Sequence, residues 1–330
     1  MTLDTLELVC PAGTPASLRT AVDAGAHTVY CGFSDETNAR NFPGLNFSRD
    51  ELAAGIAYAH DAGARVFVAV NTFPKAGGEA AWHRALADAE GMGADAVILA
   101  DLGLLAHAAD RHPGLRLHLS VQAAAANADT INFYADRFGV KRVVLPRVFS
   151  VEEIAAINRE ISVETEAFVF GGLCVMAEGR CLLSSYATGR SPNMNGVCSP
   201  ASHVVYQDTG EVLRSRLGPY TIHVSRKGQA APYPTLCKGC FAAGGATMHV
   251  FEDPASLDAA RLIPRFAEAG VKALKIEGRQ RSKAYVSAVV RCFRDAVDAL
   301  AEGRPIPVAG LSRLTEGQTS TQGAYVKTWR

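Results

Sequence analysis

The chain has 330 residues, of which 48% are hydrophobic, and this excludes a disordered segment or a disulfide-stapled mini-protein. Its 33 basic and 33 acidic residues cancel, so the charge gives no reason to expect a nucleic-acid partner, although a local basic patch is not excluded. No window of about 18 uncharged apolar residues predicts a transmembrane segment.

Short apolar, β-branched runs alternate with helical segments along most of the chain. The predicted strands are 6–10, 27–33, 65–71, 96–101, 116–122, 141–146, 166–170 and 272–277. The predicted helices are 14–26, one that begins after Ser48, 79–91, 129–138, 151–161, 256–269 and 282–302. Ser48 and Glu51 have the spacing of a capping box, which fixes the start of the second helix.

Eight such repeats predict an α/β fold with a parallel sheet covered by helices, and a TIM-like (β/α) barrel, either closed or incomplete and distorted, fits them best. An open doubly wound sheet is the alternative, but no GxGxxG follows the first strand, which weakens a dinucleotide-binding Rossmann domain. We expect one barrel-like domain over residues 1–330, with a long cysteine-rich insertion at 173–240 after the seventh strand.

In a barrel, the chemistry lies at the carboxyl ends of the strands. Several polar residues stand at these predicted ends, and each of them has the alternative of capping a helix or bonding to a loop. They are Asn71, Asp101, Gln122, Arg147, Glu277 and Arg279.

The cysteines fall into two groups. The first residues are acidic and lack a basic segment, so no signal peptide is predicted and the expected location is the cytoplasm, where disulfides are rare. Cys10, Cys31 and Cys292 lie among apolar neighbours and are predicted to be buried core thiols. The other five lie in the insertion, which is rich in Gly, Pro, Ser and Arg: Cys174, Cys181, Cys198, Cys237 and Cys240.

Thiolates that converge on one centre suit an iron–sulfur cluster or a structural zinc ion. Knuckle-type zinc sites generally pair two C-x₂-C units, and only Cys237 and Cys240 have this spacing, so the wide spacing favours a cluster. The radical-SAM triplet C-x₃-C-x₂-C is absent. A catalytic cysteine has less support, because no His stands at a telling spacing.

Several segments together resemble the peptidase U32 family. Residues 166–174 (EAFVFGGLC) and 179–184 (GRCLLS) resemble its signature, and 274–279 (LKIEGR), followed by Tyr285 and Val286, resembles its second motif. Residues 120–123 and 40–42 fit it too, so the resemblance covers nearly the whole chain. Despite the family name, neither H-E-x-x-H nor G-x-S-x-G is present, and no protease machinery is predicted.

Within the family, cysteine spacings of 7, 17 and 39 resemble the branch that acts in ubiquinone biosynthesis. This resemblance implies a [4Fe-4S] cluster held by Cys174, Cys181, Cys198 and Cys237, although Cys240 leaves the fourth ligand ambiguous. It also implies an oxygen-independent hydroxylase subunit that acts on the aromatic ring of a ubiquinone precursor, with prephenate as oxygen donor. The implied partner is a UbiV-like U32 protein in a heterodimer, and a lipid-carrier protein is a further candidate.

The zero net charge, and the short sequence after the last predicted helix, favour a quinone precursor over RNA. Two alternatives stay open: a U32-type tRNA or rRNA hydroxylation factor, and a non-catalytic scaffold that carries a cluster or zinc. Arg147 and Arg279 suit the two carboxylates of prephenate, because a guanidinium binds a carboxylate through two parallel hydrogen bonds. Glu277, two residues before Arg279 on the predicted strand, would point the same way, as a general base or as an ion-pair partner.

Overall fold

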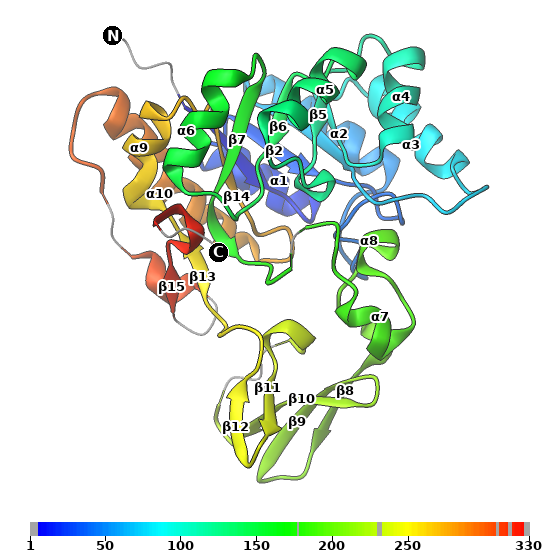
Figure 1. Ribbon diagram of the computed structural model, residues 1–330, viewed down its shortest axis with the longest axis vertical. Helices are drawn as coiled ribbons and strands as arrows, with labels where there is room; N and C mark the ends of the chain where they lie inside the picture. Colours follow the sequence, from blue (N-terminus) through cyan, green and yellow to red (C-terminus); the bar gives the residue numbers. More distant parts are fainter. Residues whose placement is uncertain (1–5, 177, 230–232, 308–309, 316–318, 327–330) are drawn as a thin grey trace.

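Eight parallel strands close into a barrel in the computed structural model, which describes residues 6–176, 178–229, 233–307, 310–315 and 319–326. The barrel strands are β1 (Glu7–Pro11), β2 (Thr28–Cys31), β3 (Arg65–Val70), β4 (Ala96–Leu99), β5 (Leu117–Leu119), β6 (Arg142–Val144), β7 (Glu164–Gly172) and β14 (Ala273–Ile276). The first seven pair in chain order, and β14 closes the ring by pairing with both β7 and β1 (Figure 1). The predicted TIM-like barrel is therefore confirmed in its closed form, and the open doubly wound sheet is excluded.

Helices follow the strands and cover the outside of the barrel (Figure 1). They are α1 (Pro15–Asp23), α2 (Arg49–Asp61), α3 (Ala80–Gly91), α4 (Leu102–Arg111), α5 (Ala128–Phe138), α6 (Val151–Glu160), α9 (Ile263–Glu268) and α10 (Lys283–Ala301). The capping box is present at α2, where Ser48 and Glu51 exchange side-chain-to-backbone hydrogen bonds. Asp101 is the N-cap of α4, where its side chain accepts from the N–H of Leu104, so the capping alternative holds for this residue.

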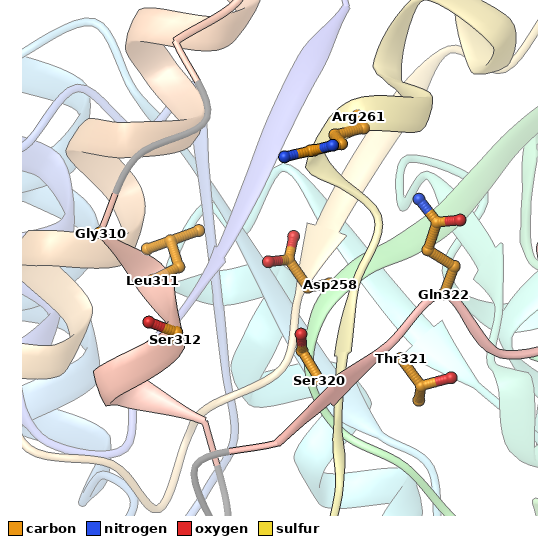
Figure 2. Close-up of a pocket in the computed structure, with 8 residues that line it drawn as sticks. All are labelled: Asp258, Arg261, Gly310, Leu311, Ser312, Ser320, Thr321 and Gln322. Carbon is orange, nitrogen blue, oxygen red and sulfur yellow. The ribbon is translucent and has the colours of Figure 1, made fainter.

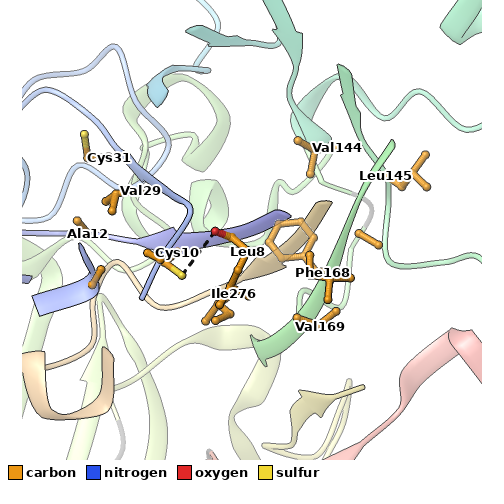
Figure 3. Packing of buried hydrophobic residues seen from close by; sticks show 14 of the residues in the cluster. Leu8, Cys10, Ala12, Val29, Cys31, Val144, Leu145, Phe168, Val169 and Ile276 are labelled. Atoms are coloured by element: carbon orange, nitrogen blue, oxygen red, sulfur yellow. Dashed lines mark hydrogen bonds between the residues drawn. The ribbon is translucent and has the colours of Figure 1, made fainter. Parts of the chain in front are cut away.

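The main core lies between the strands and the surrounding helices. Leu8 and Cys10 of β1 and Val29 and Cys31 of β2 are all fully buried in it (Figure 3). Burial of a large apolar side chain such as Leu8 contributes about 1.5–3 kcal/mol. Cys10 and Cys31 are confirmed as core thiols, whereas Cys292 on α10 is only partly buried against this core.

Charged side chains lie inside the barrel, near the amino-terminal ends of its strands. Arg142 Nη2 lies 2.6 Å from Glu7 Oε2, and Arg142 Nη1 lies 3.2 Å from Glu166 Oε2. Lys275 forms an ion pair with Glu166, and its Nζ stands 3.9 Å from the ring centroid of Tyr30. Burial alone would raise the pKa of Glu7, but Arg142 outweighs it and lowers that pKa. These charges are buried in matched pairs, which is the condition for burying them at all.

Between β7 and β13 the chain builds a smaller structured region beside the barrel (Figure 1). It contains α7 (Leu183–Thr188), α8 (Pro192–Asn195), an antiparallel sheet of β8 (Val204–Asp208), β9 (Val212–Leu217) and β10 (Tyr220–Arg226), and a hairpin of β11 (Cys240–Ala243) and β12 (Ala246–His249). Its small core joins Ala187 of α7 to Leu217 and Ile222 of the sheet. The sequence indicated only a long connection here, because these strands carry many exposed polar residues and bury few apolar ones.

The predicted helix 256–269 is wrong in its first half. Residues Ser256–Asp258 form β13, which pairs antiparallel with the end of β7 and parallel with β15 (Ser320–Thr321). Pairing with distant strands overrides the local helical pattern, and the helix starts only at Ile263. Among the described residues, no helix is long and apolar enough to cross a bilayer.

Candidate functional site

The four cysteines predicted as ligands come from separate segments of the chain. Cys174 follows β7, Cys181 precedes α7, Cys198 follows α8, and Cys237 lies in a 3₁₀ turn, Leu236–Lys238. Burial, and then the neighbouring thiols of Cys198, Cys174 and Cys181, raise the pKa of Cys237 to about 12. The fold therefore brings the four thiols close enough to act on one another electrostatically.

The other thiols show the same coupling. Burial raises the pKa of Cys198, and Cys174 and Cys181 raise it further. Burial also raises the pKa of Cys181, with Cys174 adding to the effect. Cys240 is not among the main causes of these shifts; it starts β11, opposite His249. Crowded thiols resist becoming thiolates together, and a bound cation or cluster relieves this repulsion.

The donor set fits an iron–sulfur cluster. In the part of the chain that the structure describes, no three His, Cys, Asp or Glu side chains stand close enough to hold a metal ion as they are. A cluster binds each thiolate through a different iron, so the sulfur atoms it needs lie farther apart than the four around one zinc ion.

Arg40 links the thiols to Glu277. Its Nε lies 3.6 Å from Glu277 Oε1, so Glu277 pairs with Arg40 and not with Arg279. Burial alone would lower the pKa of Arg40, but Glu277 and the thiols of Cys174 and Cys198 raise it. Arg40 was not predicted as a site residue, and its one signal was its place in the family-like segment 40–42.

Arg279 is a buried cation at the same end of the barrel. It is 4% exposed, its Nη1 donates to Asn38 Oδ1 at 3.3 Å, and no carboxylate lies within ion-pair distance among the residues described. Burial lowers the pKa of Arg279 to about 10. A buried cation with no carboxylate in direct contact is costly, and this arrangement suits an anion-binding group.

The predicted strand alternation does not apply to Glu277 and Arg279. The last barrel strand ends at Ile276, so both residues lie in the following loop. This loop turns at Gly278, whose φ is +158°.

Arg147 already has partners. Its Nε lies 2.8 Å from Glu178 Oε1, and its Nη1 donates to the carbonyl of Gly172 at 3.0 Å. Its Cζ also lies 4.2 Å from the ring centroid of Phe168. These contacts fasten the end of β7 to the segment between Cys174 and Cys181. Glu178 gave no signal in the sequence, because its partner is 31 residues away.

Gly179 lets this segment approach the barrel. Its φ is +75°, and a Cβ there would stand 2.0 Å from the carbonyl oxygen of Gln122. Gln122 follows β5, and its Oε1 is buried with no hydrogen-bond partner among the described residues. The approach that brings Cys174 and Cys181 over the barrel therefore requires a glycine at this position.

Two cavities have walls made by other residues, although Asn41 and Val197 in one of them directly neighbour Arg40 and Cys198 in the chain. One of about 480 Å³ lies where loops of the barrel meet the segment around α8, with Lys75, Trp82 and Arg190 in its wall. The other, of about 360 Å³, lies against β13 and β15, and Asp258 and Arg261 line it (Figure 2). Neither lining includes a predicted site residue.

An eight-stranded α/β barrel with a cysteine-bearing region after its seventh strand thus defines the class of this protein. Residues 13–321 match the family model described as Peptidase family U32, and the chain belongs to this family. It is 33% identical over 93% of its length to "tRNA hydroxylation protein P" of Escherichia coli and spans 71% of that protein. It is 30% identical over 95% of its length to the E. coli "23S rRNA 5-hydroxycytidine C2501 synthase", of which it spans 42%. A solved structure, the U32 peptidase Mk0906, shares the fold with a TM-score of 0.51 and 15% identity over 84% of this chain and 94% of that one.

Proposed function

We propose that this protein is an oxygen-independent hydroxylase that acts on a base of tRNA or rRNA. The observation that carries the proposal is the gathering of four thiols, two of them beside Arg40, at one end of a closed barrel. Relatives named as tRNA and rRNA hydroxylation proteins support both the reaction and the substrate. They favour the RNA alternative over a quinone precursor, and they weigh against the expectation that no nucleic acid is involved.

In this proposal Cys174, Cys181, Cys198 and Cys237 hold a [4Fe-4S] cluster. When bound, the cluster supplies one-electron redox chemistry or an iron that acts as a Lewis acid. The guanidinium of Arg40 lies beside Cys174 and Cys198 and lowers the cost of collecting negative charge there.

The buried residues beside the thiols bind the oxygen donor. Arg279, which has no carboxylate partner among the described residues, binds a carboxylate of the donor, for which the family resemblance implies prephenate. Glu277 is held by Arg40 within reach of the same region and accepts the proton that the ring loses. Binding of the oxygen donor by Arg147 stays a prediction. Its N–H groups already donate to Glu178 and to the carbonyl of Gly172, and these contacts give Arg147 a positioning role.

A ubiquinone precursor is the second candidate substrate. The observation that favours it is the cysteine spacing of the ubiquinone-biosynthesis branch, and the same residues would serve because the reaction again replaces a ring C–H by C–OH. In this case the protein works with a UbiV-like partner.

The two substrates are separated in a deletion strain grown without oxygen. Total RNA is digested and its nucleosides are analysed by mass spectrometry, while the quinones of the same cells are profiled. Loss of a hydroxylated nucleoside that the wild-type gene restores, with normal quinones, supports the proposal. Unchanged nucleosides together with missing ubiquinone would overturn it in favour of the second candidate.

A further inference from the structure

The sheet β8–β10 presents one face that is rich in arginine. On β9, Ser215 and Leu217 are fully buried, so Arg214 and Arg216 point to the opposite side. On β10, Val224 pairs directly with Arg214 and is 55% exposed. We call this side the arginine face; its residues are Val205, Gln207, Arg214, Arg216, Val224 and Arg226.

The arginines of this face are regularly spaced. Arg214 and Arg216 stand two residues apart on one strand, which corresponds to roughly 6.6–6.8 Å. Arg226 pairs with Val212 and is therefore a diagonal neighbour of Arg214, at roughly 7–8 Å. A row of this kind suits a chain of repeated negative charges better than one small anion.

The described part of the protein does not neutralise these cations. Among the described residues, no carboxylate lies within ion-pair distance of Arg214, Arg216 or Arg226, and none belongs to the arginine face. Arg216 Nη2 donates to the carbonyl of Pro219, while its Nε is buried without an acceptor in the described chain. In a chain of zero net charge, this concentration is a local basic patch.

The opposite side of the sheet connects to the segments that carry the thiols. Leu217 and Ile222 form a small core with Ala187 of α7, and Leu236 packs against it. Cys181 lies just before α7, and Cys237 follows Leu236 directly. A ligand held on the arginine face is therefore held in fixed relation to two of the four cysteines.

An aromatic side chain lies on the same structured region. Tyr186 of α7 is 79% exposed, although it is large and largely apolar. Such a side chain is a stacking platform for an unpaired base, on the helix that packs against the other side of the sheet.

We propose that the arginine face binds the sugar–phosphate backbone of the RNA substrate, an inference that rests on the proposed function. Charge complementarity selects this occupant, since phosphates repeat along RNA as the arginines repeat along the sheet. Such contacts position a strand without reading its sequence, and this leaves the choice of base to the barrel.

Binding of fluorescently labelled, unfractionated tRNA to the full-length protein tests this, measured by anisotropy between 50 and 200 mM salt. The test variant is Arg214→Gln/Arg226→Gln. The matched control is Arg137→Gln/Arg159→Gln, which removes two exposed charges from α5 and α6. The test variant should bind more weakly at every salt concentration, and the slope of log K against log salt should fall by about 1.4–1.8, while the control keeps the wild-type slope.

The same variants are introduced into the deletion strain, and the hydroxylated nucleoside is quantified. Reduced hydroxylation in the test variant alone, with unchanged iron content and circular dichroism, supports the arginine face. Wild-type binding and slope in the test variant overturn the inference, even if RNA is hydroxylated normally and the proposed function stands. Binding of the same variants to anionic vesicles is measured in parallel. An equal loss of binding to tRNA and to the vesicles overturns the inference as well, because the face would then respond to any anionic surface. Absence of the nucleoside in the wild-type strain overturns the proposed function instead.

Discussion

Replacement of Arg279 by Gln should weaken donor binding and leave the fold at least as stable. The side chain is 4% exposed, and its hydrogen bond to Asn38 is 3.3 Å long. Loss of a buried charge-assisted contact costs about 2–5 kcal/mol of binding, which is a loss of roughly 30- to several-thousand-fold in affinity. An exposed rim contact would cost about 0.2–1 kcal/mol, or less than about sixfold.

The replacement should affect donor binding and the melting temperature differently. A buried cation without a counter-charge destabilises the free protein, so Arg279→Gln should keep or raise the melting temperature while donor binding falls. Calorimetric titration of prephenate into anaerobic, iron-loaded protein measures donor binding, and thermal unfolding measures the melting temperature. Arg281→Gln is the matched control, because Arg281 donates to the carbonyl of Leu314 and not to the site. A variant that binds prephenate within threefold of wild type, or that melts at a clearly lower temperature, would refute the reasoning.

Three further outcomes concern the fold beneath the site. Arg142→Leu removes the buried cationic partner of Glu7, leaves its carboxylate with the half-exposed Arg65 and with Thr28, and should destabilise the protein by about 3–5 kcal/mol in urea unfolding; a loss under 1 kcal/mol would contradict the pairing. The lowered pKa of Glu7 contributes stability that is present above about pH 4.3 and lost as the pH falls through its folded value, so Glu7→Gln should flatten the decline of unfolding free energy below pH 4. Gly179→Ala forces a contact with the barrel and should lower iron retention measured after gel filtration, whereas Gly189→Ala, which meets nothing within 4 Å and also has positive φ, serves as the control.

The barrel was predictable because its signals are local and repeated. An apolar run such as 65–71 predicts a strand, and a cap such as Ser48 predicts the start of a helix. Eight such repeats are compatible with few folds. The hairpins of the insertion were missed, since their strands carry few apolar residues and are stabilised by a small core that includes Ala187 and Leu217.

The candidate site was predictable by residue type but not by pairing. Cysteine spacing gave the candidate ligands, which stay a prediction, while the partners of Arg147 and Glu277 come from distant parts of the chain. Glu277 pairs with Arg40, and Arg147 with Glu178, because the loops after different strands meet at one end of the barrel. Such contacts depend on tertiary structure, and no local sequence pattern predicts them.

The iron content of single cysteine variants tests the central claim most directly. Protein is purified without oxygen, and iron, acid-labile sulfide and absorbance near 400 nm are measured on the same samples. We expect about four irons per chain for the wild type and for Cys240→Ala, and a loss of most of the iron when any one of Cys174, Cys181, Cys198 or Cys237 is replaced by Ala. Full iron in a Cys174→Ala/Cys181→Ala variant, or zinc in place of iron in the wild type, would contradict it.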